Sequence, residues 1–178
     1  MEIRLEKPGN ALDWLRLHGL YLTAFPPSER KPFSKIRSMY RQGRSDVWCI
    51  LRGGKFAGLA TTVNGADTVL LDYLAVSKSC RGLGVGSAAM AALLEIYRDK
   101  GFFVEIETTR EAGDNPEERL RRKRFYQAAG LEDLGVSARI FGVKMDLLGT
   151  RCRMSFEDYK NFYRDFYSPR AAEHLEEF

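Results

Sequence analysis

Apolar and polar residues follow one another along the chain with the periods of strands and helices. Short stretches that alternate, or that are apolar throughout, predict strands, because successive side chains of a strand point to opposite faces. Apolar residues three or four positions apart predict helices between several of these stretches. The resulting order mixes both kinds of element and predicts an α/β fold. The predicted strands are residues 2–6, 47–51, 56–63, 68–76 and 102–108, with a last strand or pair of strands over 138–147.

Two helices are predicted between the first and second strands. The first covers residues 10–25 and ends before two prolines, since proline disfavours helix at the residue before it. The second covers residues 28–43, with a glycine at its end. The predicted apolar faces are Leu12, Leu15, Leu22 and Phe25 in the first helix and Phe33, Ile36, Met39 and Tyr40 in the second.

The middle of the chain predicts an antiparallel meander followed by a buried helix. Glycine-containing turns at 52–55 and 64–67 have the composition of hairpin connections between the three strands. The helix over residues 86–100 is apolar around most of its circumference, which predicts that it packs closely on the sheet. Gly101 stands where a left-handed C-terminal cap is expected.

Capping signals predict two more helices towards the C-terminus. Asn115 is the expected N-cap of a helix that starts with Pro116 and ends at Gly130. Ser155 and Asp158 have the spacing of a capping box at the start of a terminal helix. The aromatic face of that helix consists of Phe156, Tyr159, Tyr163 and Phe166.

Length and composition indicate one globular domain with an addition. At 178 residues and 44% hydrophobic content, the chain can bury a single core. We expect residues 1–150 to form that domain and residues 151–178 to form a helical extension. Its aromatic face packs either on its own domain or on a partner, a homodimer included.

The chain shows no signal for a membrane, a leader or a metal. No apolar run approaches the roughly 20 residues of a membrane span, and the first residues alternate in the manner of a strand. We therefore expect a cytoplasmic protein. Cys49, Cys80 and Cys152 are far apart and lack the spacing of metal ligands, so reduced thiols are expected. The net charge of +4 does not choose a partner by itself.

A glycine-rich segment connects a predicted strand to a predicted helix. It reads Arg-Gly-Leu-Gly-Val-Gly-Ser over residues 81–87. Such a turn lets main-chain N–H groups and the positive end of the following helix hold phosphate oxygens. A mononucleotide loop would need a lysine between Gly86 and Ser87, and a dinucleotide motif would need its third glycine elsewhere, so ATP and NAD are disfavoured.

Two motifs in order resemble the GNAT superfamily of acyl-CoA-dependent N-acetyltransferases. The first is Arg-x-x-Gly-x-Gly, carried by Arg81, Gly84 and Gly86, which resembles the pyrophosphate-binding signature of that family. The second, over residues 124–131, resembles its Phe-Tyr-x-x-x-Gly-Leu helix end. The resemblance implies a mixed, mostly antiparallel central sheet that is flanked by helices and splayed at a cofactor cleft. The terminal helix is an addition to that fold.

The resemblance also implies acetyl-CoA as the cosubstrate and assigns residues to it. The strand end would face the pantetheine arm, and a main-chain N–H group there would polarise the thioester carbonyl. The glycine turn would receive the pyrophosphate. The residues implied are Leu74, Ala75, Val76, Arg81, Gly82, Leu83, Gly84, Val85, Gly86 and Ser87.

Acetyl transfer needs an acid for the leaving thiolate and a base for the amine. Tyr126, at the family's tyrosine position, is the expected acid, with core packing as the competing interpretation. Asp72, inside an apolar strand, and Glu105 are ranked equally as direct or water-mediated bases. Glu107 is ranked lower, and structural ion pairing is the competing interpretation for these three carboxylates.

One position departs from the family. Arg119 stands where members commonly have an asparagine, within a basic run over residues 119–124. This run is interpreted as a solvated face, with contacts to the cofactor's 3′-phosphate or to an anionic acceptor as alternatives. It has no interleaved aromatic residues, which argues against a nucleic-acid partner.

The expected function is direct acetyl transfer from acetyl-CoA to a primary amine. No nucleophilic Cys-His-Asp arrangement can be recognised, so an acetyl-enzyme intermediate is disfavoured. The acceptor is a small molecule or a peptide or protein amine, and the acidic candidates favour a cationic one. The alternative is a non-catalytic sensor that binds acyl-CoA.

Overall fold

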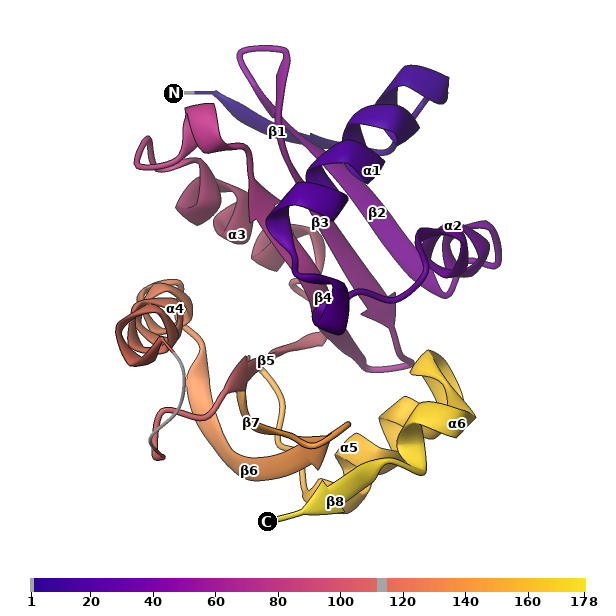
Figure 1. Cartoon of the computed structure of the whole chain (residues 1–178), viewed down its shortest axis with the longest axis vertical. Coiled ribbons are helices and arrows are strands. Elements are labelled where there is room, and N and C mark those ends of the chain that lie inside the picture. The colour runs from indigo at the N-terminus through magenta and orange to yellow at the C-terminus, as the bar shows by residue number, and fades with distance from the viewer. Residues whose placement is uncertain (1, 112–114) are drawn as a thin grey trace. The chain divides into compact units, whose positions relative to one another are not determined.

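The computed structural model describes residues 2–111 and 115–178. It divides into two compact units. Figure 1 colours the chain by residue number. The first unit consists of Met1–Asn64 and Leu71–Ile96, and the second of Gly65–Leu70 and Tyr97–Phe178.

The first unit is a sheet with helices. Its strands lie in the order β1-β2-β3-β4. The pair β1 and β2 is antiparallel, with Ile3 opposite Arg52, and the pair β2 and β3 is antiparallel, with Ser45 opposite Val63. The elements are β1 (Ile3–Glu6), α1 (Ala11–Ala24), α2 (Phe33–Arg41), β2 (Ser45–Arg52), β3 (Lys55–Asn64), the later part of β4 (Thr68–Val76) and α3 (Val85–Ile96), with short 3₁₀ turns at Pro27–Glu29 and Lys78–Cys80.

One face of this sheet carries a core cluster of the first unit, beneath α1 and α2. Helix α1 lies in front of β3 in Figure 1, and its Leu17 and Tyr21 are each 1% exposed. Burial of such apolar and aromatic side chains is the main stabilising contribution to the unit. The core cluster is Leu17, Tyr21, Ile36, Val47, Cys49, Leu59, Tyr73 and Ala75.

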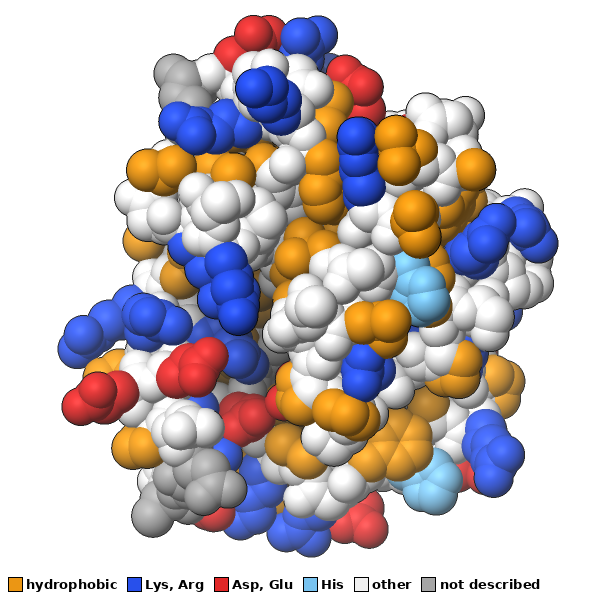
Figure 2. Space-filling view, turned by 45° about the horizontal axis from the view of Figure 1, so that its top comes forward, with side chains coloured by type: hydrophobic (Ala, Val, Ile, Leu, Met, Phe, Trp, Pro, Cys, Tyr) orange, Lys and Arg blue, Asp and Glu red, His pale blue; other side chains and the backbone are white. Residues whose placement is uncertain are grey.

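The predicted apolar face of the first helix is wrong at its three leucines, whereas Phe25 packs against the core cluster. Leu12, Leu15 and Leu22 are 51%, 67% and 47% exposed, and apolar side chains reach the surface in Figure 2. The helix is apolar on two sides, and the side with Tyr21 is buried, since that aromatic side chain removes more apolar surface from water. Its hydroxyl group also donates a hydrogen bond to Lys31 O at 3.0 Å.

The second helix begins later than predicted. Residues Pro27–Glu29 form a 3₁₀ turn, and α2 starts at Phe33. Pro32 explains the difference, because its ring disfavours helical backbone at Lys31 and it cannot donate a helical hydrogen bond. Gly43 has a φ of 70°, in agreement with a glycine that closes this helix.

Gly101 is a strand residue and not the C-terminal cap of the preceding helix. Helix α3 ends at Ile96, and Gly101 is the first residue of β5. A Cβ atom at Gly101 would lie 2.6 Å from the Cβ of Cys152, so close packing is the reason for glycine here. The N–H group of Gly101 donates to Asp67 O at 2.9 Å.

The second unit contains the remaining strands in the order β5-β7-β6-β8. All three pairs are antiparallel, with Phe102 opposite Thr150 and Ala138 opposite both Met145 and Glu177. The predicted last strand or pair of strands is a hairpin. The elements are β5 (Gly101–Glu107), α4 (Pro116–Ala128), β6 (Glu132–Ile140), β7 (Val143–Thr150), α5 (Phe156–Phe162), a π-helical turn (Tyr163–Tyr167), α6 (Pro169–Ala172) and β8 (Leu175–Glu177), and the first residues of β4 also belong to this unit.

Helix α4 confirms two of its three predicted end signals. Pro116 is its first residue, and Gly130 follows it with a φ of 91°. Asn115 occupies the N-cap position but its side chain makes no capping hydrogen bond, because its backbone is left-handed with a φ of 54°. The carbonyl group of Asn115 accepts from the N–H groups of Glu118 and Arg119 instead, each at 3.1 Å.

The C-terminal segment, residues 151–178, packs on strands of the second unit. The capping box of Ser155 and Asp158 is confirmed, and Tyr159 and Tyr163 are buried. The intervening Phe162 is also buried and contacts Phe103, with ring centroids 5.0 Å apart. Strand β8 extends this packing by pairing with β6.

The two units together confirm a mixed α/β fold whose registered strand pairs are antiparallel. The splay at a cofactor cleft and the domain boundary at residue 150 stay predictions. In the described part of the chain, no helix has the length and apolar character needed to cross a membrane.

Candidate functional site

The glycine turn joins β4 to α3 in the first unit. The turn reverses direction with two left-handed glycines, Gly82 at a φ of 73° and Gly84 at 72°. Side chains rarely adopt this backbone, which explains the glycines at both positions. The Arg81 side chain turns back, and its Nε atom donates to Val76 O at 3.1 Å. Arg81 therefore fastens the turn to the end of the strand.

The turn presents a row of main-chain donors. Among the described residues, the N–H groups from Gly82 to Ser87 have no hydrogen-bond acceptor, and the first helical bond of α3 runs from Ala88 N to Gly84 O at 3.0 Å. A Cβ atom at Gly82 would meet nothing within 4 Å, so the turn is open on that side. Unpaired N–H groups at the start of a helix bind anions.

The strand end that leads to this turn has two different faces. Ala75 is part of the core beneath α1 and α2, so Leu74 and Val76, which alternate with it, point to the other side of the sheet. Both are half-buried. Gly58 of β3 lies against this strand, and a Cβ atom there would come within 2.5 Å of Ala75 O.

Asp72 forms an ion pair in the first unit. Lys31 Nζ lies 2.5 Å from Asp72 Oδ2, and the two side chains are 10% and 9% exposed. A carboxylate that is removed from water needs such compensation. This pairing matches the structural interpretation of Asp72, and a role in proton transfer stays a prediction.

The connection between α1 and α2 is tied to the adjacent Tyr73. The Tyr73 hydroxyl group donates to Glu29 O at 2.9 Å and accepts from the N–H group of Lys31 at 3.3 Å. Tyr21 and Phe25 contact the Tyr73 ring, with centroid distances of 4.9 and 4.8 Å. Several contacts thus fix this connection against the sheet.

Glu105 and Glu107 lie on one face of β5 and have partners within the second unit. The hydroxyl groups of Tyr159 and Tyr163 each donate to Glu105 Oε1 at 2.6 Å. Glu107 forms an ion pair with Arg119. Arg119, the departure from the family pattern, therefore contacts a carboxylate of the neighbouring strand.

Tyr126 lies near the end of α4 and is half-buried. Its ring meets Phe125 edge-on, with centroids 5.1 Å apart. Burial raises the pKa of the Tyr126 phenol to about 12, although the charge of Arg122 acts in the opposite direction. No hydrogen-bond partner for its hydroxyl group is found among the described residues. An unpaired tyrosine hydroxyl group at a half-buried position is available to donate to a ligand.

Sequence reasoning missed the buried Asp146 of β7. Its side chain is 0% exposed and accepts from Thr108 Oγ1 at 3.0 Å and from Ser137 Oγ at 2.8 Å. Arg110 Nη2 lies 3.0 Å from the same carboxylate. The sequence feature that could have identified Asp146 is an acidic residue within an apolar stretch, the same feature that identified Asp72. The cluster anchors the chain that follows β5 to the sheet.

The histidines and cysteines add no site. The side chain of His18 stacks on Phe33, and both histidines reach the surface in Figure 2 (pale blue). The three cysteines are free thiols. Within the described ranges, no cluster of histidine, cysteine and acidic side chains could hold a metal ion.

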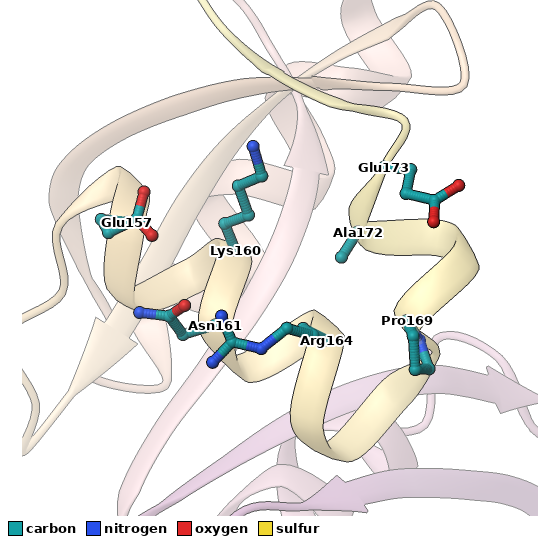
Figure 3. Close-up of a pocket in the computed structure, with 7 residues that line it drawn as sticks. All are labelled: Glu157, Lys160, Asn161, Arg164, Pro169, Ala172 and Glu173. Carbon is teal, nitrogen blue, oxygen red and sulfur yellow. The ribbon is translucent and has the colours of Figure 1, made fainter.

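A groove of about 450 Å³ lies on the C-terminal segment. Figure 3 shows Lys160 and Arg164 on one helical stretch and Glu173 on the other side of the groove. Arg164 is held by Asp165 at 2.8 and 3.1 Å. None of the predicted site residues lines this groove.

The sequence model of the acetyltransferase (GNAT) family matches residues 14–130, about two thirds of the chain. The chain belongs to the GNAT acetyltransferase family. The matched range includes the glycine turn and Tyr126, the two parts of the GNAT resemblance. No curated protein matches the chain.

Solved structures of other GNAT proteins share the fold. A protein from Bacteroides thetaiotaomicron that is described as a GNAT-family acetyltransferase has a TM-score of 0.75 and 19% identity, with 94% of this chain and 98% of that one covered. An aminoglycoside 6′-N-acetyltransferase in complex with coenzyme A has a TM-score of 0.66 and 16% identity, with 87% and 100% covered. Spermidine N-acetyltransferase from Vibrio cholerae in complex with CoA and spermine has a TM-score of 0.63 and 10% identity, with 83% and 94% covered.

Proposed function

We propose that the chain is an N-acetyltransferase that moves an acetyl group from acetyl-CoA directly to a primary amine. The observation that carries this proposal is the row of unpaired main-chain N–H groups from Gly82 to Ser87, at the start of α3. Such donors suit the pyrophosphate of coenzyme A. Membership of the GNAT family supports the same cosubstrate.

The chain's own residues would bind and orient this cosubstrate. Arg81 fixes the turn through Val76 O, while Gly82 and Gly84 give the main chain its two left-handed bends. Leu74 and Val76 would line the pantetheine arm, with a main-chain N–H group near Ala75 directed at the carbonyl oxygen. Acetyl-CoA supplies the thioester that is attacked by the amine.

Tyr126 is proposed as the general acid. Its phenol, with a pKa of about 12, keeps its proton at neutral pH, and its hydroxyl group has no acceptor among the described residues. It can therefore donate a hydrogen bond or a proton to a leaving thiolate.

Asp72 and Glu105 are the proposed carboxylates for the amine. Each has partners in the structure: Lys31 pairs with Asp72, and two tyrosine hydroxyl groups donate to Glu105. An ionised carboxylate can take a proton from the amine directly or through a water molecule, or it can hold a cationic acceptor.

The proposed acceptor is a small-molecule or peptide amine. Two GNAT proteins of similar fold have names that refer to spermidine and to aminoglycosides, both of which carry several amino groups. A cationic amine of this class is complementary to the ionised carboxylates of Asp72 and Glu105.

The first test is a calorimetric titration of the protein with acetyl-CoA, with ATP and NAD as controls. We expect binding of acetyl-CoA alone and its loss in an Arg81→Ala, Gly84→Val variant, because that variant removes the strand anchor and the left-handed bend. A folded wild type that does not bind acetyl-CoA would contradict the proposal.

Release of the CoA thiol separates the enzyme from the alternative. An N-acetyltransferase releases the thiol in the presence of an acceptor from a panel of polyamines, aminoglycosides and peptides. A non-catalytic sensor binds acetyl-CoA and releases no thiol with any of them.

A further inference from the structure

Two tyrosines of the C-terminal segment converge on Glu105. The Tyr159 hydroxyl group comes from α5 and that of Tyr163 from the following π-helical turn, and both lie 2.6 Å from Glu105 Oε1. Distances this short are typical of hydrogen bonds to a charged acceptor. A segment that is an addition to the GNAT fold thus contacts a predicted site residue.

The two phenols are held rigidly. Tyr159 and Tyr163 are 0% and 1% exposed. Phe103 meets the Tyr159 ring edge-on at a centroid distance of 6.3 Å, and Tyr167 stacks on Tyr163 at 4.5 Å. Their hydroxyl groups therefore have little freedom to leave Glu105, and the carboxylate is fixed in turn.

Both phenols remain donors at physiological pH. Burial raises the pKa of Tyr159 and of Tyr163 well above the ordinary value, and the charge of Glu105 is the second cause of this rise. Two donors on one carboxylate oxygen favour the ionised form. They also fix the orientation of the carboxylate, which suits the binding of a cation.

The strand places this carboxylate on the face of β5 that the C-terminal segment covers, beside the buried Phe103. Val104 and Ile106, on either side of Glu105, are each 1% exposed, and Glu105 lies on the opposite face of β5 and is half-buried. The strand thus presents an oriented negative charge on the face where the tyrosines lie. An ammonium group is the complementary ligand.

We propose that Glu105 recognises a cationic amine acceptor and that Tyr159 and Tyr163 are positioning residues that hold its carboxylate ionised and oriented. The inference rests on the proposed function, since the amine is the acceptor of that reaction. It assigns the C-terminal segment a part in acceptor recognition in addition to its part in packing.

The test compares four variants of the full chain. Glu105→Gln removes the charge at nearly constant shape, and Tyr159→Phe and Tyr163→Phe each remove one hydroxyl group and keep the ring. Phe162→Leu is the matched control, because it alters the packing against Phe103 from the same helix without a change of donors. Binding of spermidine, kanamycin and an alanine-starting peptide to the protein saturated with CoA is measured by calorimetry.

We expect the wild type to bind at least one of these amines. Glu105→Gln should weaken that binding by about tenfold or more, which corresponds to the loss of one hydrogen bond to a charged group. Each tyrosine variant should weaken it by only several-fold, because the tyrosines act through the carboxylate and do not contact the amine. Phe162→Leu should leave the affinity unchanged. In a Glu105→Gln background the tyrosine variants should cause no further loss, since they act through the carboxylate.

The kinetic counterpart is a rise in the KM for the amine with little change in kcat. A fall in kcat at constant KM in Glu105→Gln would assign the residue to proton removal and overturn the inference. Equal affinity in the wild type and the tyrosine variants, or no amine binding by the wild type, would also overturn it. The binding arm needs no turnover, so amine binding without acetyl transfer would contradict the proposed function and still support recognition by Glu105.

Discussion

At the scale of single residues, Tyr126 combines an unpaired hydroxyl group with a desolvated ring. Its pKa of about 12 lies above the ordinary tyrosine value, because burial disfavours the phenolate. A group that must be protonated in order to act loses its contribution as pH rises through its pKa. Activity that depends on Tyr126 should therefore persist through neutral and mildly alkaline pH.

Tyr126→Phe should lower turnover by about 10²-fold to 10⁴-fold, the range of a positioned acid, with little effect on acetyl-CoA affinity. The substitution keeps the ring contact with Phe125 and removes only the hydroxyl group. Initial rates of CoA release measure the turnover, and a calorimetric titration with acetyl-CoA measures the affinity. Unchanged turnover would remove the role assigned to this residue.

The sequence identified carboxylates at risk of burial but not their partners. Asp72 was recognisable because it interrupts an apolar strand, whereas the Lys31 that pairs with it comes from a connection distant in the sequence. Asp146 interrupts an apolar strand in the same way and was overlooked. Partners such as Tyr159 for Glu105 depend on how the terminal segment packs, which no local pattern encodes.

At the scale of elements, periodicity located α1 but not its buried face. The helix has leucines on one side and Leu17 and Tyr21 on the other, and only tertiary contacts with Phe33 and Tyr73 select the second side. Strands were predicted better, since alternation and glycine turns reflect local geometry. Glycine was misinterpreted where it serves close packing, at Gly101.

Gly101→Ala and Gly19→Ala should change stability in opposite directions. A Cβ atom at Gly101 would collide with Cys152 at 2.6 Å, so about 1–3 kcal/mol of destabilisation is expected. Gly19 lies in α1 with nothing within 4 Å of its added Cβ atom, and alanine there should stabilise by about 0.5–1 kcal/mol. Urea unfolding of both variants measures these changes; equal stability of Gly101→Ala and the wild type would contradict the close-packing explanation.

At the scale of the whole molecule, local motifs were sufficient to indicate the family, and the C-terminal segment was the part they described least. The glycine turn and the Tyr126 helix end both lie within the range matched by the GNAT family model. Residues 151–178 lie beyond that range, yet their side chains enter the core of the second unit, where Tyr159, Phe162 and Tyr163 are buried. Strand β8 also pairs with β6.

Removal of residues 151–178 should therefore destabilise the second unit. Each of its three buried aromatic side chains contributes about 1.5–3 kcal/mol, and together they account for much of the 5–15 kcal/mol that typically stabilises a domain. We expect the chain truncated after Thr150 to unfold at lower temperature or to aggregate, as followed by circular dichroism and size-exclusion chromatography. A chain that ends at His174 is the matched control, because it loses β8 but retains the buried aromatic residues. If the chain truncated after Thr150 melts at the same temperature as the full chain, the domain folds without the segment. The contacts of the segment with Glu105 would then contribute to acceptor recognition and not to stability.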